Sequence, residues 1–305
     1  MKLATPFRLL LLLIDYIKFK LLERKAKIKK NELGIVFPYH MGDLYSLCVF
    51  LNQIKRRYKA NVVLVLQKKY TPVIKMFRDN VRIVAVNDYE LPYPLLGYVD
   101  YNLLKLISKP AKGKLAIYTL YKVEKHEIFI KEYFNIEKIK WRKPSIPKKT
   151  IYKNLINRFK KLGLKPKRTV ILYPVSYSAP LLPNKFWEKL AEEIKKKGYT
   201  VATNVIGNEK EIKGTIPLYT SIEEKFASAE IAGTVIGIRS GIFDVISYAN
   251  CKKIIIYTYA LDSSQKKGID YSIKYLPHRG KIKEIFVNNN STELILDKVL
   301  KNLTN

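Results

Sequence analysis

Short apolar runs alternate with longer amphipathic segments along most of this chain, beginning near residue 31. A run of about four to eight apolar residues is typical of a strand buried on both faces, whereas apolar residues three and four apart are typical of a helix. Buried strands separated by helices predict a parallel sheet. In the first half we expect strands at 33–38, 61–66, 81–86 and 115–120, and helices at 43–57 and 72–77.

The same alternation begins again after a linker-like segment around Pro144 and Pro147. Gly198 is placed to end one helix, and Ser221 with Glu224 has the spacing of a capping box that opens another. Further strands are expected at 169–173, 199–206, 234–238 and 253–258, and helices at 151–162, 184–197, 242–249 and 292–303. Because 305 residues exceed what one core commonly supports, we predict an α/β protein with parallel-sheet domains at 31–150 and 151–290 and a C-terminal helix at 291–305.

The first 30 residues have a different pattern from the rest of the chain. An apolar run at 9–14 is followed by Asp15, Lys18 and Lys20, and then by a basic stretch at 24–30. The run is far shorter than the roughly 20 apolar residues of a spanning helix, and no signal-peptide cleavage site follows it. We expect a basic amphipathic helix over 1–30 that lies on an anionic membrane surface; the alternative is a helix packed on the protein itself.

The charge balance narrows the class of partner. Lysine and arginine total 57 against 26 acidic residues, a net charge of +31, although most of the lysines are scattered. Such an excess suits anionic lipid, phosphorylated substrates or nucleic acid, but no nucleic-acid-binding motif is present. Cys48 and Cys251 have no CxxC neighbour and the three histidines are dispersed, so neither a zinc site nor a disulfide is indicated and a reducing cytoplasm fits.

Ligands of open parallel sheets bind at the loops that follow the carboxyl ends of the strands, and two such sheets form a cleft between these ends. In the first domain this loop contains Tyr39, His40, Met41, Gly42 and Asp43. Asp43 is a candidate general base that takes the proton of an acceptor hydroxyl, with His40 as a second acid/base candidate and Tyr39 and Met41 as acceptor contacts. The alternative is that Asp43 caps the following helix.

Three loops of the second domain are candidates for holding a phosphorylated donor. Tyr173, Ser176 and Ser178 follow the first strand and could line a diphosphate site. Gly207 and Glu209 follow the second strand, near the place expected for the nucleotide base at 206–209 and 220–224. Pro and Ser are also ordinary loop residues, so these loops alone do not separate a ligand site from a plain turn.

The third loop, with Arg239, Ser240 and Gly241, runs from a strand into a helix. A helix N-terminus and a forked guanidinium both suit phosphate, and Gly241 lets a ligand approach the backbone. Asp244 would reach a ligand hydroxyl or hold Arg239; alternatively Arg239 forms an ion pair across the domains and Ser240 caps the helix. The chain lacks GxGxxG, GxxxxGK[ST] and Asp-x-Asp, so we expect no cofactor and no metal, with cationic groups neutralising the leaving diphosphate.

Together these segments resemble the heptosyltransferase-like glycosyltransferases of glycosyltransferase family 9. Gly42-Asp43 before an apolar helix looks like the family's first turn, and Tyr173-Pro174-Val175-Ser176 looks like its His-Pro-Gly-Ala/Ser segment. Pro183, the segments 187–191 and 198–201, and Gly207-Asn208-Glu209 follow in the family's order, so the resemblance spans 34–66 and 169–258. It implies the GT-B fold, two Rossmann-like domains facing a central cleft, and an inverting transfer in which Asp43 is the base.

The donor loop departs from this family. Where the family has Asp-Thr-Gly-Pro-x-His, this chain has Arg239-Ser240-Gly241-Ile242-Phe243-Asp244, and Pro180 stands where a phosphate-binding lysine is expected. The Arg-Ser-Gly turn is similar to the phosphate-gripping arginine of fucosyltransferases with this fold. The identity of the donor sugar therefore stays open.

The sequence predicts a metal-independent inverting glycosyltransferase that extends a bacterial lipooligosaccharide or capsule glycan from a nucleotide-diphosphate sugar. We expect it in the cytoplasm, peripheral at the inner face of the cytoplasmic membrane, with a glycolipid or lipid-linked acceptor and no nucleic acid partner. The arrangement requires Asp43 to face Arg239 across the cleft. The alternatives are another nucleotide-sugar enzyme of the same fold, epimerase-like or fucosyltransferase-like, and a basic nucleic-acid-binding protein.

Overall fold

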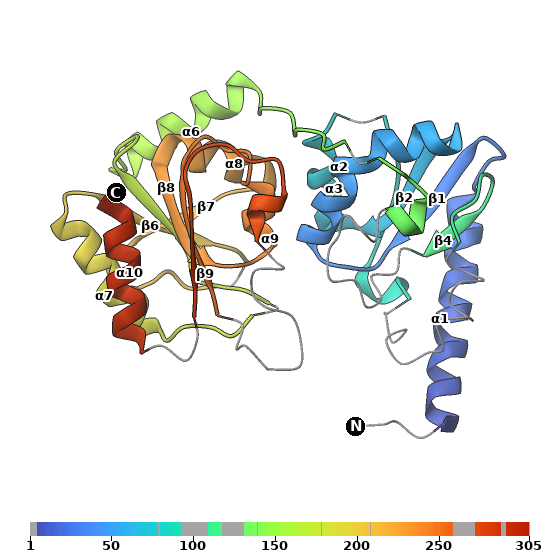
Figure 1. Cartoon of the computed structure of the whole chain (residues 1–305), viewed down its shortest axis with the longest axis horizontal. Coiled ribbons are helices and arrows are strands. Elements are labelled where there is room, and N and C mark those ends of the chain that lie inside the picture. Colours follow the sequence, from blue (N-terminus) through green and yellow to red (C-terminus); the bar gives the residue numbers. More distant parts are fainter. Residues whose placement is uncertain are drawn as a thin grey trace. The chain divides into compact units, whose positions relative to one another are not determined.

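A computed structural model of the chain describes residues 5–78, 80–92, 109–117, 131–138, 140–177, 179–207, 209–258, 272–287 and 291–304. The chain divides into two units, Met1–Arg142 and Lys143–Asn305. Each unit has its own parallel sheet with helices packed against it (Figure 1). The α/β class predicted from the apolar pattern is confirmed.

The first unit is built on a four-stranded sheet in the order β3-β2-β1-β4, with every pair parallel. The strands are β1 (Glu32–Phe37), β2 (Asn61–Gln67), β3 (Arg82–Val86) and β4 (Leu115–Ile117). The helices are α1 (Thr5–Ala26), α2 (Met41–Tyr58) and α3 (Thr71–Lys75), with 3₁₀ turns at Lys68–Tyr70 and Asp88–Glu90.

Helix α1 packs on one face of this sheet. Its buried residues Phe19, Leu22 and Ala26 join a core cluster with Val36 of β1 and Val65 of β2, which are register partners. Gly34 makes room beside them, because a Cβ atom there would lie 2.7 Å from Ile28 and from Leu115. The small residue at position 34 therefore allows the chain after α1 to cross close to the sheet.

An ion pair fixes the start of this sheet. Arg82 of β3 grips Glu32 of β1 with both sides of its guanidinium, at 3.0 and 2.6 Å, and donates to the carbonyl of Ala26 at the end of α1. The hydrogen bonds from Arg82 lower the pKa of Glu32 below its ordinary value. One arginine thus ties together two strands and the first helix.

The second unit is built on a six-stranded parallel sheet in the order β10-β9-β8-β5-β6-β7. The strands are β5 (Thr169–Tyr173), β6 (Thr200–Val205), β7 (Ile216–Tyr219), β8 (Gly233–Ile238), β9 (Lys252–Tyr257) and β10 (Ile282–Phe286). The helices are α6 (Lys149–Lys161), α7 (Asn184–Lys196), α8 (Ile222–Ala232), α9 (Gly241–Val245) and α10 (Thr292–Thr304), with a 3₁₀ turn at Ile273–Tyr275.

Helices cover this sheet through apolar faces. Trp187 and Leu190 of α7 and Val299 of α10 are fully buried in one cluster with alternate residues of the central strands, such as Leu172 and Ile236. Helix α8 begins as predicted, with Ser221 and Glu224 forming reciprocal capping hydrogen bonds of 3.3 and 2.9 Å. The cluster buries one face of the central strands β5 and β8 against α7 and α10.

The predicted elements agree with the structure to within about two residues, with four exceptions. The helix expected over 1–30 ends at Ala26, and residues 1–4 lie outside the described residues. The helix expected at 242–249 ends at Val245 and continues as a turn. The strands β7 and β10 were not predicted, because β7 is only four residues long and contains Pro217, and β10 is interrupted by Lys283 and Glu284. Of the strand expected at 115–120, residues 118–120 lie outside the described residues. None of the described helices combines the length and the apolar character needed to cross a bilayer.

Candidate functional site

The connectivity of the second sheet places a switch in strand order between β5 and β8. From β5 the chain moves through β6 to β7 on one side, and then returns to form β8, β9 and β10 on the other side. The loops after β5 and β8 therefore diverge, and in open parallel sheets the crevice at such a point is where ligands bind. Two of the three loops singled out in the sequence start at this place.

A hydrogen bond joins these two loops. Ser176, in the loop after β5, is buried and donates from Oγ to the backbone carbonyl of Arg239 at 3.2 Å. The amide of Arg239 in turn donates to the carbonyl of Ile256 at 2.9 Å, which extends the pairing of β8 with β9. The predicted residues Ser176 and Arg239 therefore lie together at the switch point.

The Arg239 side chain is held by a carboxylate of its own loop. Its NH2 atom donates to Oδ1 of Asp244 at 2.6 Å and its NH1 atom donates to Oδ2 at 3.1 Å, with a further bond from NH1 to the carbonyl of Ser240 at 2.6 Å. Relative exposures of 14% and 5% make this a largely buried pair. Of the two roles considered for Asp244, the structure shows the one in which it fixes Arg239.

Ser240 and Gly241 form the entry to α9. Ser240 is the N-cap, in extended conformation, and Gly241 is the first residue of this five-residue helix. The Ser240 hydroxyl is buried and has no hydrogen-bond partner among the described residues, so it does not cap the helix with its side chain. A helix of little more than one turn has a small dipole, so a ligand here would rely on first-turn amides and side chains.

Tyr173 is the last residue of β5. Its side chain is buried, with the ring 5.9 Å from that of Phe243, and burial raises the pKa of its hydroxyl. Gly237 of β8 lies against it, because a Cβ atom at 237 would meet the Tyr173 carbonyl oxygen at 2.4 Å. The ring of Tyr173 therefore belongs to the core, and the donor-binding role of this residue stays a prediction.

The loop after β6 carries Gly207 and Glu209. Gly207 adopts a left-handed conformation with φ of +57°, and the carboxylate of Glu209 accepts the amide of Ile206 at 3.2 Å across the turn. Tyr177, from the loop after β5, approaches the other carboxylate oxygen at 3.5 Å. Ser178 and Asn208 lie outside the described residues.

A buried lysine near this loop was not found from the sequence. Lys225 of α8 is 2% exposed, and its ammonium donates to Oδ1 of Asn204 at 2.6 Å and to Oγ1 of Thr220 at 3.3 Å. Burial lowers its pKa to about 8, while the charges of Glu209 and Glu224 oppose that shift. The signal available in the sequence was a lysine on the side of α8 that also carries Phe226 and Ala229.

In the first unit, the turn after β1 also lies at a switch point, because β2 and β4 flank β1 on opposite sides. Asp43, in the first turn of α2, accepts the amide of His40 at 3.3 Å. Asp43 therefore has the capping position considered above, although it accepts from the residue before the helix. His40 is exposed, Tyr39 lies edge-on to Phe37 at 5.9 Å, and Met41 opens α2.

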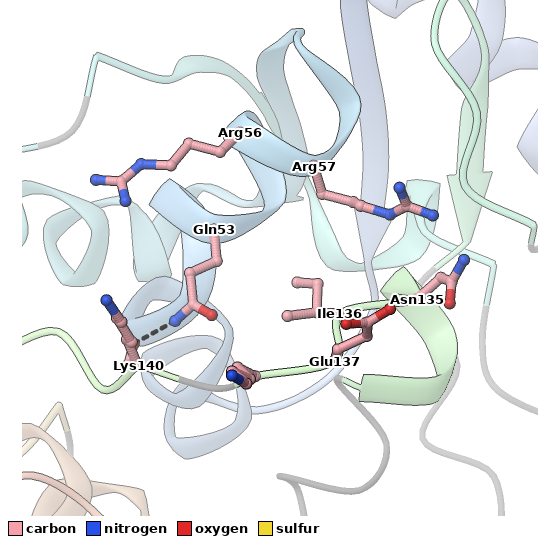
Figure 2. A pocket seen from close by; sticks show the side chains of 8 residues that line it. Gln53, Arg56, Arg57, Asn135, Ile136, Glu137 and Lys140 are labelled. Carbon is pink, nitrogen blue, oxygen red and sulfur yellow. Dashed lines mark hydrogen bonds between the residues drawn. The ribbon is translucent and has the colours of Figure 1, made fainter.

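A basic pocket lies at the opposite end of α2 from Asp43 (Figure 2). Its volume is about 460 Å³, and the amide of Gln53 donates to the carbonyl of Lys140 at its rim. At 1.5 Å per residue, Arg57 is about 20 Å along the helix from Asp43, so this pocket is separate from the candidate site. The lining residues are Gln53, Arg56, Arg57, Asn135, Ile136, Glu137, Lys138 and Lys140.

No protein-family model and no curated protein matches the sequence. Among solved structures, a glycosyl transferase family 9 protein from Veillonella parvula DSM 2008 is similar, with a TM-score of 0.61 and 12% identity over 92% of this chain and 99% of that one. The chain has the fold of a family 9 glycosyltransferase.

Two further structures support this assignment of the fold. The E. coli ADP-heptose heptosyltransferase II matches with a TM-score of 0.59 and 13% identity, over 89% of this chain and 97% of that one. The E. coli heptosyltransferase WaaC with ADP matches with a TM-score of 0.52 and 10% identity, over 88% and 99%. The likeness covers both units, so the glycosyltransferase fold accounts for nearly the whole chain.

Proposed function

We propose that this protein is a glycosyltransferase with the GT-B arrangement, which moves a sugar from a nucleoside-diphosphate donor to a bacterial surface glycan. The observation that carries the proposal is the likeness to three glycosyltransferase structures over about nine-tenths of the chain. The meeting of Ser176 and Arg239 at the switch point of the second sheet supports the same reading. Function is set by the site as well as the fold, so each step of the proposed reaction needs residues of this chain.

In the proposed reaction, the acceptor hydroxyl oxygen attacks the anomeric carbon of the donor sugar. A new carbon–oxygen bond forms as the bond between that carbon and the diphosphate breaks, so the configuration inverts. Asp43 accepts the proton of the attacking hydroxyl and the nucleoside diphosphate leaves with the bonding electrons. The proposal requires Asp43 and the Arg239 loop to meet the same donor and acceptor.

The donor diphosphate is assigned to the switch point of the second sheet. The Arg239 guanidinium, the first-turn amides at Ser240 and Gly241, and the loop of Ser176 supply the polar groups there. We propose that these groups, with no metal ion, balance the charge of the leaving group. Three further residues complete this set. Asp244 positions Arg239, Ser178 belongs to the loop after β5, and Tyr173 contributes its backbone at the end of that strand.

The nucleotide is assigned to the neighbouring loop after β6. Gly207 and Glu209 lie there, and Lys225 is close to the same strand end through its bond to Asn204. WaaC was solved with ADP, so ADP is the first nucleotide to test. The acceptor, in contact with Tyr39, His40 and Met41, is proposed to be a lipid-linked lipooligosaccharide or capsule glycan at the inner face of the cytoplasmic membrane.

The test begins with ligand-dependent melting. ADP, UDP and GDP are added separately to the full chain, and we expect one of them to raise the melting temperature as its concentration exceeds its Kd. Asp43→Asn should keep that shift and lower sugar transfer by orders of magnitude, because an amide cannot take the proton. Asp297→Asn, an exposed position on α10, is the matched control and should change neither property.

Product analysis separates this function from its alternatives. With donor alone, a transferase should show only slow hydrolysis, whereas an epimerase would convert the donor into a second nucleotide sugar. Full transfer activity in Asp43→Asn would remove Asp43 as the base. Binding of duplex DNA in place of any nucleotide, falling steeply with salt, would favour the nucleic-acid-binding alternative.

A further inference from the structure

Helix α1 has two apolar faces, and among the described residues one is buried against the sheet while the other is exposed. The buried residues Asp15, Phe19, Leu22 and Ala26 are spaced by four, three and four, which places them on a single stripe. A second group is exposed by between 40% and 57% and has the same spacing: Leu10, Leu13, Ile14, Ile17 and Leu21. At about 100° per residue, this exposed stripe lies nearly opposite the buried one.

Such a face is unusual for a helix that covers a sheet. A surface helix normally turns its polar side to water, and contiguous exposed apolar patches on a folded chain mark interaction surfaces. The core cluster that takes Phe19 and Leu22 already satisfies the inner side of α1. Among the residues that the structure describes, the outer stripe is not part of this core cluster, which points to a partner outside the unit.

The charges around the stripe indicate what that partner is. On a helical projection Lys20 and Arg24 fall on one side of the exposed leucines and isoleucines, and Lys18 and Lys25 fall on the other. Lys25 is paired with Glu90 at 2.7 Å and Lys18 donates to the Leu91 carbonyl at 3.3 Å, so Arg24 and the lysines after the helix carry most of the charge offered to a partner. Glu23 is paired with Lys20 at 2.8 Å, and Asp15 is on the buried stripe. The exposed residues Lys27, Lys29 and Lys30 continue the basic character directly after the helix.

An apolar stripe flanked by basic residues matches the boundary between lipid headgroups and acyl chains. There the leucines and isoleucines leave water, while lysine and arginine side chains extend to anionic headgroups. The position of α1 in its unit suits this, because its N-terminal end lies beyond the ends of the strands (Figure 1).

We propose that the outer face of α1 docks on an anionic lipid bilayer, inserting Leu10, Leu13, Ile14, Ile17 and Leu21 while the inner face stays packed on the sheet. The biological reason for this docking rests on the proposed function, since a lipid-linked acceptor would lie in the same membrane. The contact itself depends only on α1. Packing on the protein and docking on lipid can occur together, because they use opposite faces of α1.

The test is sedimentation of the full chain with vesicles. Binding is expected to vesicles that contain phosphatidylglycerol, to be much weaker with phosphatidylcholine alone, and to fall as salt is added. The double variant Leu13→Gln/Ile17→Gln should lower the partition coefficient by roughly a hundredfold, at about tenfold for each apolar side chain removed from the interface. Its melting temperature should stay unchanged, since both side chains are exposed.

Two control variants make the outcome decisive. Ile156→Gln/Leu294→Gln changes exposed apolar residues of the second unit and should leave vesicle binding unchanged. Lys20→Gln/Arg24→Gln should weaken binding to phosphatidylglycerol vesicles several-fold and reduce its salt dependence. Equal binding by Leu13→Gln/Ile17→Gln and the native chain would overturn the proposal. So would a dimer of the native chain, seen by analytical ultracentrifugation, that this variant abolishes, because the stripe would then be a contact between two copies.

The same experiments keep this inference apart from the proposed function. The α1 variants should retain the nucleotide-induced rise in melting temperature and transfer to an acceptor without its lipid. A chain that binds vesicles through α1 but transfers no sugar would refute the transferase alone. A chain that transfers sugar but ignores vesicles would refute the docking surface alone.

Discussion

The guanidinium of Arg239 and the carboxylate of Asp244 form a two-point ion pair, at 2.6 and 3.1 Å, inside the loop assigned to the donor diphosphate. The pair holds the planar arginine in one orientation and offsets its positive charge before any ligand arrives. A diphosphate bound there would meet an arginine already fixed in place. The Asp244 carboxylate beside it would partly offset the attraction between the arginine and the diphosphate.

This pair makes a prediction about stability. Arg239→Met should lower the free energy of unfolding by about 3–5 kcal/mol, because it leaves the Asp244 carboxylate buried without its partner. The double variant Arg239→Met/Asp244→Leu should recover most of that loss, since no buried charge remains. Urea denaturation of the two variants and the native chain measures both effects. Equal losses in the single and double variants would show that the ion pair is not the cause.

A second prediction separates the capping role of Asp43 from its proposed catalytic role. Asp43→Ala should cost about 1 kcal/mol of unfolding free energy, because the His40 amide loses its acceptor. Asp43→Asn should cost less, since an amide oxygen can still accept that bond. Both variants should lose sugar transfer to a similar extent. Transfer that tracks stability, with the asparagine variant nearly active, would assign Asp43 to capping alone.

The lowered pKa of Lys225 predicts that this residue adds to the stability of the protein as the pH becomes alkaline. Its pKa is about 8 in the folded chain against 10.5 for a free side chain, so the unfolded chain binds more protons between these values. The free energy of unfolding should therefore rise with pH across that window, by on the order of 2–3 kcal/mol.

The matched variant is Lys225→Met, which has similar length and no charge. Its stability should lack this rise, while Asn204 still accepts a hydrogen bond from Thr220 at 3.1 Å. Urea unfolding of both proteins from neutral pH to above pH 10.5 measures the difference. A constant difference between them across the window would contradict the lowered pKa of Lys225.

The contact of Gly237 with Tyr173 gives a fourth prediction. Gly237→Ala should lower the free energy of unfolding by about 2 kcal/mol or more, because its Cβ would lie 2.4 Å from a backbone oxygen of the adjacent strand. Nucleotide binding should weaken with it, since β5 and β8 carry the two loops of the switch point. Thermal melting with and without ADP measures both quantities.

The comparator is the same substitution at Gly207, where the space around the missing Cβ is open. Gly207→Ala should cost only about 1 kcal/mol, the strain of a left-handed conformation at φ of +57°. If the two substitutions cost the same, the close approach of the strands at Gly237 is not limiting.

Several features of the fold were predictable because they depend on neighbours in the sequence. The apolar run of β5 and the amphipathic spacing of α7 identify these elements almost to the residue. The capping box of Ser221 and Glu224 is a three-residue signal, and the structure confirms it. The edge strand β7 was missed because it is short and contains a proline, and β10 was missed because two charged residues interrupt its apolar run.

The candidate site was predictable only as a set of loops. Ser176 and Arg239 are 63 residues apart in the chain, and they touch because the strand order pairs β5 with β8. The sequence left two alternatives for the Asp244 carboxylate, and the structure shows its pairing with Arg239. The burial of Tyr173 depends on the close approach of β8 at Gly237, which local sequence does not reveal.

By itself, the sequence determined the alternation of strands and helices and the places where loops could carry chemistry, because periodicity and capping are local properties of the chain. The tertiary structure decided which loops meet, that Lys225 is buried with neutral partners, and that α1 packs through one apolar face and leaves the other exposed. These outcomes depend on contacts between segments far apart in sequence. Such contacts form when the sheets and helices bury apolar surface against one another, and the pattern of neighbouring residues alone does not specify them.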